Sequence, residues 1–140
     1  MELRHLRYFV AVAEEGSLTL AAEKRLHTAQ PSLSRQIRDL EYEVGVPLMN
    51  RSAHGIELTA AGRAFLDHAR LALMQVEAAI EAGIRSLPET QRTALTLLRF
   101  EELSYEEIGR VLRCSAPAVK SLIHRARETL REKLRAYRNP

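Results

Sequence analysis

The chain has 140 residues, 46% of them hydrophobic, which is enough to bury a core as one ordinary domain or as two small ones. Its single cysteine, Cys114, excludes an intramolecular disulfide framework, and its apolar runs are far too short to span a bilayer. The net charge of +3 is uneven, because residues 1–82 carry −2 and residues 83–140 carry +5. No cleavable secretory leader is visible, so we expect a cytoplasmic protein.

The first two predicted helices lie within residues 3–26. Apolar residues recur at helical spacing from Leu3 to Ala13, and Gly16 is a natural C-terminal stop for the first helix. Ser17 is well placed to cap a second, shorter helix, after which His27 and Thr28 make a turn.

Residues 29–37, AQPSLSRQI, predict the start of a third helix, with Pro31 in the first turn where its missing amide proton costs no hydrogen bond. The apolar stripe of this helix consists of Leu33, Ile37, Leu40 and Val44. Short polar and basic side chains should then face outward, as in helices that enter a DNA groove.

Residues 46–58, VPLMNRSAHGIEL, are typical of a small β-hairpin, and Thr59 should cap a long helix that runs to about Arg85. The apolar surface of that helix needs a partner. Self-association is the simplest answer, and packing onto the following helices is the alternative. The side chains expected at a dimer contact are Phe65, Ala69, Ala72, Leu73, Val76, Ala79 and Ile80.

The last third of the chain predicts three more helices. Pro88 begins one, Ser104 with Glu107 forms a capping box for the next, and Ser115 caps the last, in which Pro117 takes the place that Pro31 has earlier. Lys120, Ser121, His124 and Arg125 lie off the apolar stripe of this last helix. The stripe itself contains Val119, Leu122, Ile123, Ala126, Leu130, Leu134 and Tyr137.

Residues 1 to about 82 resemble the DNA-binding domain and linker helix of LysR-type transcriptional regulators, from MELRHLRYFV through AQPSLSRQI to TAAGRAFL. The resemblance implies a winged helix-turn-helix whose third helix enters the major groove, and a homodimer on double-stranded DNA formed through the linker helix. We expect DNA contacts from the following residues of the third helix, the turn before it and the wing: Thr28, Gln30, Pro31, Ser32, Ser34, Arg35, Arg38, Arg51 and His54.

The segment AAEKRLHTAQ is one residue longer than the spacing typical of the LysR family. Either the loop absorbs the additional residue, or the second helix shifts and the angle of the recognition helix changes.

Residues 86 to about 135 resemble the fourth conserved region of extracytoplasmic-function sigma factors, through LSYEEIGRVL and AVKSLIHRARETL. This resemblance implies a second helix-turn-helix that would contact a promoter element with Lys120, Ser121, His124 and Arg125, and would also contact RNA polymerase. Leu122 stands where many relatives carry a basic residue, which puts one backbone contact in doubt.

We therefore expect an all-α fold: a winged helix-turn-helix with a small β-hairpin wing (1–58), a linker and dimerisation helix (59–85) and a sigma region 4-like helix-turn-helix module (86–140). The expected function is a LysR-type DNA-binding regulator without the usual effector domain. The alternative is a transcription adaptor or sigma-like protein whose C-terminal module binds a promoter element or RNA polymerase. A natural gene fusion and an engineered chimera would both produce such a junction.

The sequence offers no basis for catalysis, a cofactor or a bound metal. The five histidines do not approach metal-ligand spacing with cysteines or carboxylates, and the six glycines form no phosphate-binding loop. No serine or cysteine is visibly paired with a general base.

Overall fold

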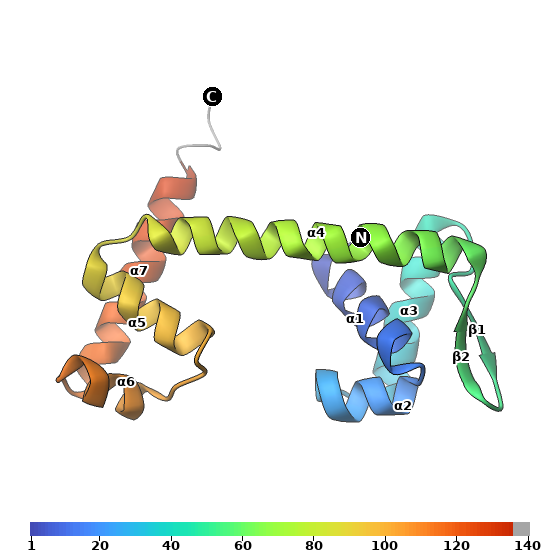
Figure 1. Cartoon of the computed structure of the whole chain (residues 1–140), viewed down its shortest axis with the longest axis horizontal. Coiled ribbons are helices and arrows are strands. Elements are labelled where there is room, and N and C mark those ends of the chain that lie inside the picture. Colours follow the sequence, from blue (N-terminus) through green and yellow to red (C-terminus); the bar gives the residue numbers. More distant parts are fainter. Residues whose placement is uncertain (136–140) are drawn as a thin grey trace. The chain divides into compact units, whose positions relative to one another are not determined.

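The computed structural model describes residues 1–135, and the chain divides into two compact units, Met1–Val76 and Glu77–Pro140. Within the described residues the fold is helical apart from one β-hairpin, which confirms the expected fold class (Figure 1). The division between units falls inside the helix that we predicted as a separate linker segment. The three functional segments inferred from the sequence stay a prediction.

The first unit begins with α1 (Leu3–Glu15), which ends at Gly16 in the left-handed region with φ 68°. A short helix, α2 (Leu18–Leu20), follows and continues into a π-helical segment, η1 (Ala21–Leu26). The hydroxyl of Ser17 accepts a hydrogen bond from the Leu20 amide at 3.2 Å, so the predicted cap is confirmed. Next come α3 (Gln30–Val44) and the strands β1 (Met49–Ser52) and β2 (Gly55–Leu58).

The core of the first unit lies between α1, α3 and the first part of α4 (Ala60–Arg85). Phe9, Leu33, Ile37 and Leu40 are fully buried, and Val44, the fourth residue of the apolar stripe predicted for α3, packs partly buried against the same core. The hydroxyl of Thr59 accepts a hydrogen bond from the Gly62 amide at 2.9 Å, and so caps α4 as predicted.

Several residues predicted at a dimer contact pack wholly or partly against the cores of their own chain, and the dimer contact itself stays a prediction. The Phe65 ring packs edge-on against Phe9, with ring centroids 5.3 Å apart, and Ala69 is only 3% exposed. Leu73 packs against the same core, whereas Ile80 packs against the core of the second unit. The periodicity of α4 located the apolar residues correctly, but periodicity does not specify which surface covers them.

The second unit contains the end of α4, α5 (Glu89–Arg99), α6 (Tyr105–Leu112) and α7 (Ala116–Arg135). Ser104 and Glu107 form the predicted reciprocal capping box at the start of α6. In the predicted stripe of α7, Val119, Leu122, Ile123 and Ala126 are buried and Leu130 packs against them, but Leu134 is 63% exposed. Leu134 lines an open depression together with Ala79 and Gly83 of α4, and Tyr137 lies outside the described residues.

None of the helices within residues 1–135 is both long enough and apolar enough to cross a membrane.

Candidate nucleic-acid interface

The first turns of α3 form an exposed polar surface, as predicted from the sequence. Ala29 precedes the helix in an extended conformation, and Pro31 occupies the first turn, as expected for a proline-led helix. Leu33, Ile37 and Leu40 face the core, whereas the opposite side of α3 is open to solvent. Thr28, in the turn before the helix, is half-buried. The predicted residues on the open side are Gln30, Pro31, Ser32, Arg35 and Arg38.

Ser34 does not lie on this open surface. It is only 5% exposed and lies on the buried side of α3, so the prediction that its side chain faces outward is wrong. One residue along a helix turns the side chain by about 100°, which places Ser34 beside the stripe of Leu33 and Ile37, whereas Arg35 lies on the opposite side. Ser32 and Ser34 look alike in sequence but differ in what they can contact.

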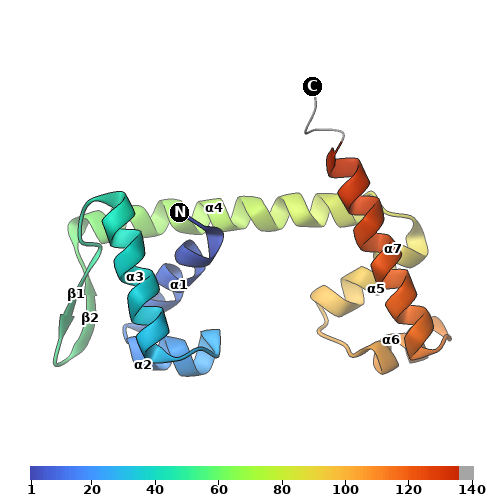
Figure 2. The ribbon, with the colours of Figure 1, turned by 180° about the vertical axis from the view of Figure 1, so that it is seen from behind.

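The hairpin supplies a second exposed edge with a basic side chain. β1 and β2 pair antiparallel from Met49 opposite Leu58 to Ser52 opposite Gly55, so that Ala53 and His54 form the loop. Arg51 and His54 are both exposed, in agreement with the predicted wing. The hairpin loop and the first turns of α3 lie at the same end of the first unit, away from α4 (Figures 1 and 2).

Close backbone contacts hold the hairpin against the corner where α1 ends. The Ile56 amide donates a hydrogen bond to the Gly16 carbonyl at 3.0 Å. Gly55 has a φ of 113°, and a Cβ at this position would lie 2.6 Å from the same carbonyl oxygen. Only glycine fits this position without displacing backbone, so the corner that ends α1 also fixes the position of the wing.

The exposed cations on this side of the first unit are not engaged by carboxylates. Among residues 1–135, the arginines of this unit that form ion pairs are Arg4, Arg25 and Arg70, and the pairs do not include Arg35, Arg38 or Arg51. Arginines without carboxylate partners at a helix tip and an adjacent wing can meet phosphates or base edges.

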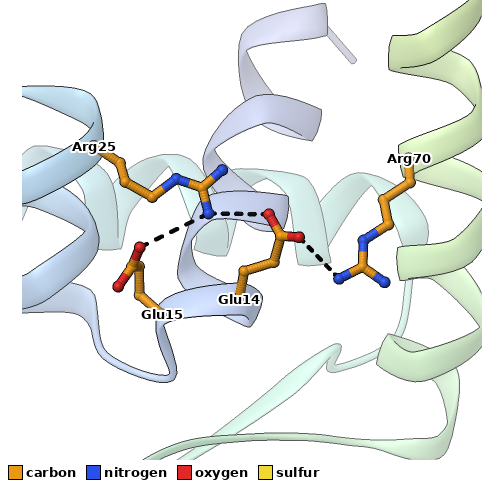
Figure 3. Close-up of polar contacts among 4 residues, drawn as sticks. All are labelled: Glu14, Glu15, Arg25 and Arg70. Carbon is orange, nitrogen blue, oxygen red and sulfur yellow. Dashed lines mark hydrogen bonds and ion pairs between the residues drawn. The ribbon is translucent and has the colours of Figure 1, made fainter.

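An ion-pair cluster that sequence reasoning missed joins α1, η1 and α4. Glu14, at the end of α1, accepts hydrogen bonds from Arg25 of η1 at 2.9 Å and from Arg70 of α4 at 2.9 Å (Figure 3). The Arg25 guanidinium also lies 3.9 Å from a carboxylate oxygen of Glu15. The hydrogen bond from Arg25 is the largest cause of a lowered Glu14 pKa, and Arg70 lowers that pKa further against the opposing effect of burial. One carboxylate thus joins three elements of the first unit, and no local sequence pattern signals that 14, 25 and 70 meet.

The second unit gathers its four predicted residues on one surface of α7. The hydroxyl of Ser115 accepts a hydrogen bond from the Ala118 amide at 3.3 Å and caps the helix. Pro117, Lys120, Ser121, His124 and Arg125 then line a shallow depression of about 540 Å³, and all five are exposed. The opposite side of the helix carries the buried Val119, Leu122 and Ile123, so the segregation predicted from the sequence is confirmed.

Comparison with known families assigns each unit separately. Residues 3–63 match the family described as bacterial regulatory helix-turn-helix protein, lysR family, and residues 77–130 match sigma-70, region 4. Both matches agree with the resemblances noted in the sequence. Within residues 1–135, no three histidine, cysteine or acidic side chains gather in a way that could hold a metal ion.

Known relatives match a little more than half of the chain. The chain is 56% identical over 86 residues to the HTH-type transcriptional regulator AlsR of Bacillus subtilis (strain 168), covering 61% of this chain and 28% of that protein. It is 64% identical over 77 residues to the Hca operon transcriptional activator HcaR of Escherichia coli (strain K12), covering 55% of this chain and 26% of that protein. The chain therefore spans only about a quarter of the length of these curated relatives.

Among solved structures, the chain is similar to the BenM DNA-binding domain in its complex with catB site 1 DNA. The two are 48% identical with a TM-score of 0.59, and the match covers 61% of this chain and 94% of that one. The similarity therefore extends over nearly all of a domain that was crystallised in complex with DNA.

Proposed function

We propose, from the LysR-family helix-turn-helix domain that residues 3–63 form, that the protein is a sequence-specific DNA-binding regulator of transcription. The observation that carries the proposal is the open side of α3, where Gln30, Ser32 and Arg35 project from the first turns of a helix whose other side is fully buried. Arginine and glutamine are the side chains that donate paired hydrogen bonds to guanine and adenine in the major groove. Thr28, Pro31 and Arg38 border this surface.

Arg51 and His54 of the wing are proposed to contact the DNA backbone or minor groove beside the site that α3 occupies. Both side chains are exposed, and the hairpin loop lies at the same end of the unit as the first turns of α3 (Figure 1), which supports this role. Phosphate contacts of this kind fix the register of a protein on DNA without reading the sequence.

The protein is further proposed to act as a homodimer through α4. Phe65, Ala69 and Leu73 pack against the core of the first unit. The dimer contact would therefore use the side of α4 that carries Leu71 and Met74, which are 55% and 64% exposed, together with the exposed Ala72. These two large apolar side chains are three residues apart, so they lie slightly less than one turn from each other on the same side of the helix.

Selection of bound sequences from a random duplex pool tests the proposed function. We expect the protein to enrich a defined motif, repeated in inverted orientation if it binds as a dimer. Arg35→Ala should weaken binding to the enriched duplex by about 1 to 3 kcal/mol while leaving binding to random DNA nearly unchanged. An unenriched pool would contradict the proposal, and an equal loss on both duplexes would reassign Arg35 to the backbone.

A second candidate function belongs to the second unit. The gathering of Lys120, Ser121, His124 and Arg125 on one side of a proline-led helix favours a second DNA contact, at a promoter element. Binding of this unit to RNA polymerase, which would make the protein an adaptor, is the competing proposal. Only the proposal of a second DNA contact predicts that neutralising Lys120 and Arg125 weakens binding to duplex DNA in the absence of other proteins.

A further inference from the structure

The two helix-turn-helix units build the turn before their proline-led helices in the same way. In the second unit the Gly109 carbonyl accepts hydrogen bonds from the amides of Arg113 and Cys114, and Arg113 adopts the left-handed conformation with φ 57°. In the first unit the Ala22 carbonyl accepts from the amides of His27 and Thr28, and His27 is left-handed with φ 48°. Both arrangements end a helix with a left-handed residue and a shared carbonyl acceptor.

Between the acceptor carbonyl and the left-handed residue, the first unit contains one more residue than the second. The left-handed residue follows its acceptor by four positions in the second unit and by five in the first. From the left-handed residue to the proline the spacing is identical, because His27 precedes Pro31 by four residues and Arg113 precedes Pro117 by four. The additional residue therefore lies inside η1, and the turn that leads to α3 is of ordinary length.

A π-turn accommodates one residue more than an α-turn. Its hydrogen bonds join residues five positions apart instead of four, so an inserted residue can widen the helix without displacing what comes after it. The sequence left open whether the loop or the second helix absorbs the additional residue. In the structure the loop does not lengthen, and the second helix absorbs the residue by widening into the π-helical segment. Removing one residue from η1 should restore an α-turn and leave both flanks in place.

Arg25 fixes the widened segment to the rest of the first unit. Its guanidinium lies 2.9 Å from Glu14 on α1, and Glu14 in turn pairs with Arg70 on α4 (Figure 3). The side chains of Arg25 and Glu14 are 39% and 34% exposed, so the pair contributes little to the free energy of unfolding. An exposed pair that joins three elements acts mainly on their relative placement, and α3 begins only five residues after Arg25.

We propose that Arg25 is a positioning residue for the DNA-recognition helix α3, and that the residue added by the π-turn, represented by Lys24, is dispensable for recognition. The proposal deepens the proposed function and rests on it. Arg25 acts through Glu14 and sets the angle at which Gln30 and Arg35 approach the groove. Lys24 is exposed, belongs to the same element and pairs with no carboxylate among residues 1–135.

Arg25→Gln, with Lys24→Gln as a matched control, tests the positioning role. Both variants remove one positive charge from η1 by the same substitution. The measurements are the affinities for the selected operator duplex and for a random duplex of equal length, each over a range of salt concentrations. We expect Arg25→Gln to lower the ratio of operator to random affinity about threefold or more, and Lys24→Gln to leave it unchanged.

Two results would overturn the role of Arg25. One is an unchanged affinity ratio in Arg25→Gln. The other is an equal loss on both duplexes with a salt slope reduced by about 0.9, which is the signature of a phosphate contact. A parent protein that shows no sequence preference would instead overturn the proposed function, and the inference with it. A parent preference that persists unchanged in Arg25→Gln overturns the inference alone.

Single-residue deletions test the dispensable residue. Deleting Lys24 shortens η1 to the length of an α-turn and keeps the arginine next to Leu26. Deleting Arg25 shortens η1 by the same amount but places the lysine next to Leu26. Deleting Ala29 shortens the turn itself. We expect the Lys24 deletion to select the same motif as the parent, the Arg25 deletion to discriminate less, and the Ala29 deletion to lose specific binding. If the Lys24 deletion unfolds cooperatively like the parent but selects a different motif, the added residue sets specificity and the proposal fails.

Discussion

Ser32 and Ser34 show how one position along a helix changes what a side chain can do. Ser32 is exposed beside Gln30 and Arg35, whereas Ser34 is 5% exposed against the core. We predict that Ser32→Ala weakens binding to the selected duplex by about 0.5 to 1.5 kcal/mol, the value of one hydrogen bond, without changing thermal stability. Ser34→Ala should leave the selected motif unchanged. Titrations of both variants on one duplex check this, and a larger binding defect in Ser34→Ala would contradict the assignment.

Glu14 gives the first unit a contribution to stability that depends on pH. Because the hydrogen bond from Arg25, aided by Arg70, lowers the Glu14 pKa below its ordinary value of 4.5, the folded protein binds this proton more weakly than the unfolded chain does. The contribution of Glu14 to the free energy of unfolding is therefore fully present above pH 4.5, and it is lost as the pH falls through the lowered pKa.

We predict from this that Glu14→Gln lowers the free energy of unfolding at pH 7 by less than about 1 kcal/mol, because the partners are exposed. The difference from the parent should shrink as the pH falls below 4.5. Urea unfolding at several pH values measures it. Glu2→Gln is the control, because Arg4 is the one ion-pair partner of Glu2 among residues 1–135, and both lie at the start of α1. A difference that grows toward acid pH would contradict the prediction.

At the scale of elements, two glycines of α4 differ sharply in what surrounds them. A Cβ on Gly62 would lie 1.8 Å from the Leu48 carbonyl oxygen, whereas a Cβ on Gly83 would meet only the side-chain atom Cδ2 of Leu130 at 3.2 Å. We predict that Gly62→Ala destabilises the protein by about 1 to 3 kcal/mol, because backbone has to move at the start of the helix. Gly83→Ala should be neutral or stabilising by up to about 1 kcal/mol, since alanine favours helix. Thermal unfolding of the two variants distinguishes a rigid contact from a flexible one.

Much of this fold could be predicted from local chemistry, because caps, prolines and apolar spacing act over a few residues. Ser17, Thr59, Ser104 and Ser115 cap helices where the sequence placed them. The π-turn was missed because AAEKRL has the composition of an ordinary helix, and its wider hydrogen bonding depends on fixed elements on both sides.

The errors in the predicted sites have a different physical origin. The burial of Ser34 and Ala69 depends on tertiary packing that a local pattern does not specify, and the Glu14 cluster joins residues far apart in sequence. Periodicity establishes that a side of a helix is apolar. It does not say whether that side meets the same chain or another copy.

At the scale of the whole molecule, the exposed side of α4 determines the predicted oligomeric state. Leu71 and Met74 remain 55% and 64% exposed after both cores of the chain are formed. We predict that Leu71→Glu with Met74→Glu raises the dimer dissociation constant about tenfold or more, because burying two such side chains is worth several kcal/mol. Tyr42→Glu, at an aromatic side chain that is 89% exposed on α3, should leave the dimer intact. Sedimentation velocity measures both, and a monomeric parent would contradict the prediction.

The salt dependence of binding can separate the two candidate roles of the second unit. Each phosphate that a protein neutralises contributes about −0.9 to the slope of log K against log salt. If Lys120 and Arg125 meet phosphates, replacing both by alanine should reduce the magnitude of the slope by about 1.8 on a promoter-length duplex. The loss should vanish on a duplex trimmed to the motif that α3 selects. Replacing Arg85 and Arg92, which line a different surface of the same unit, controls for net charge. Equal slopes for the two double variants would favour the adaptor, whose second unit binds protein and not DNA.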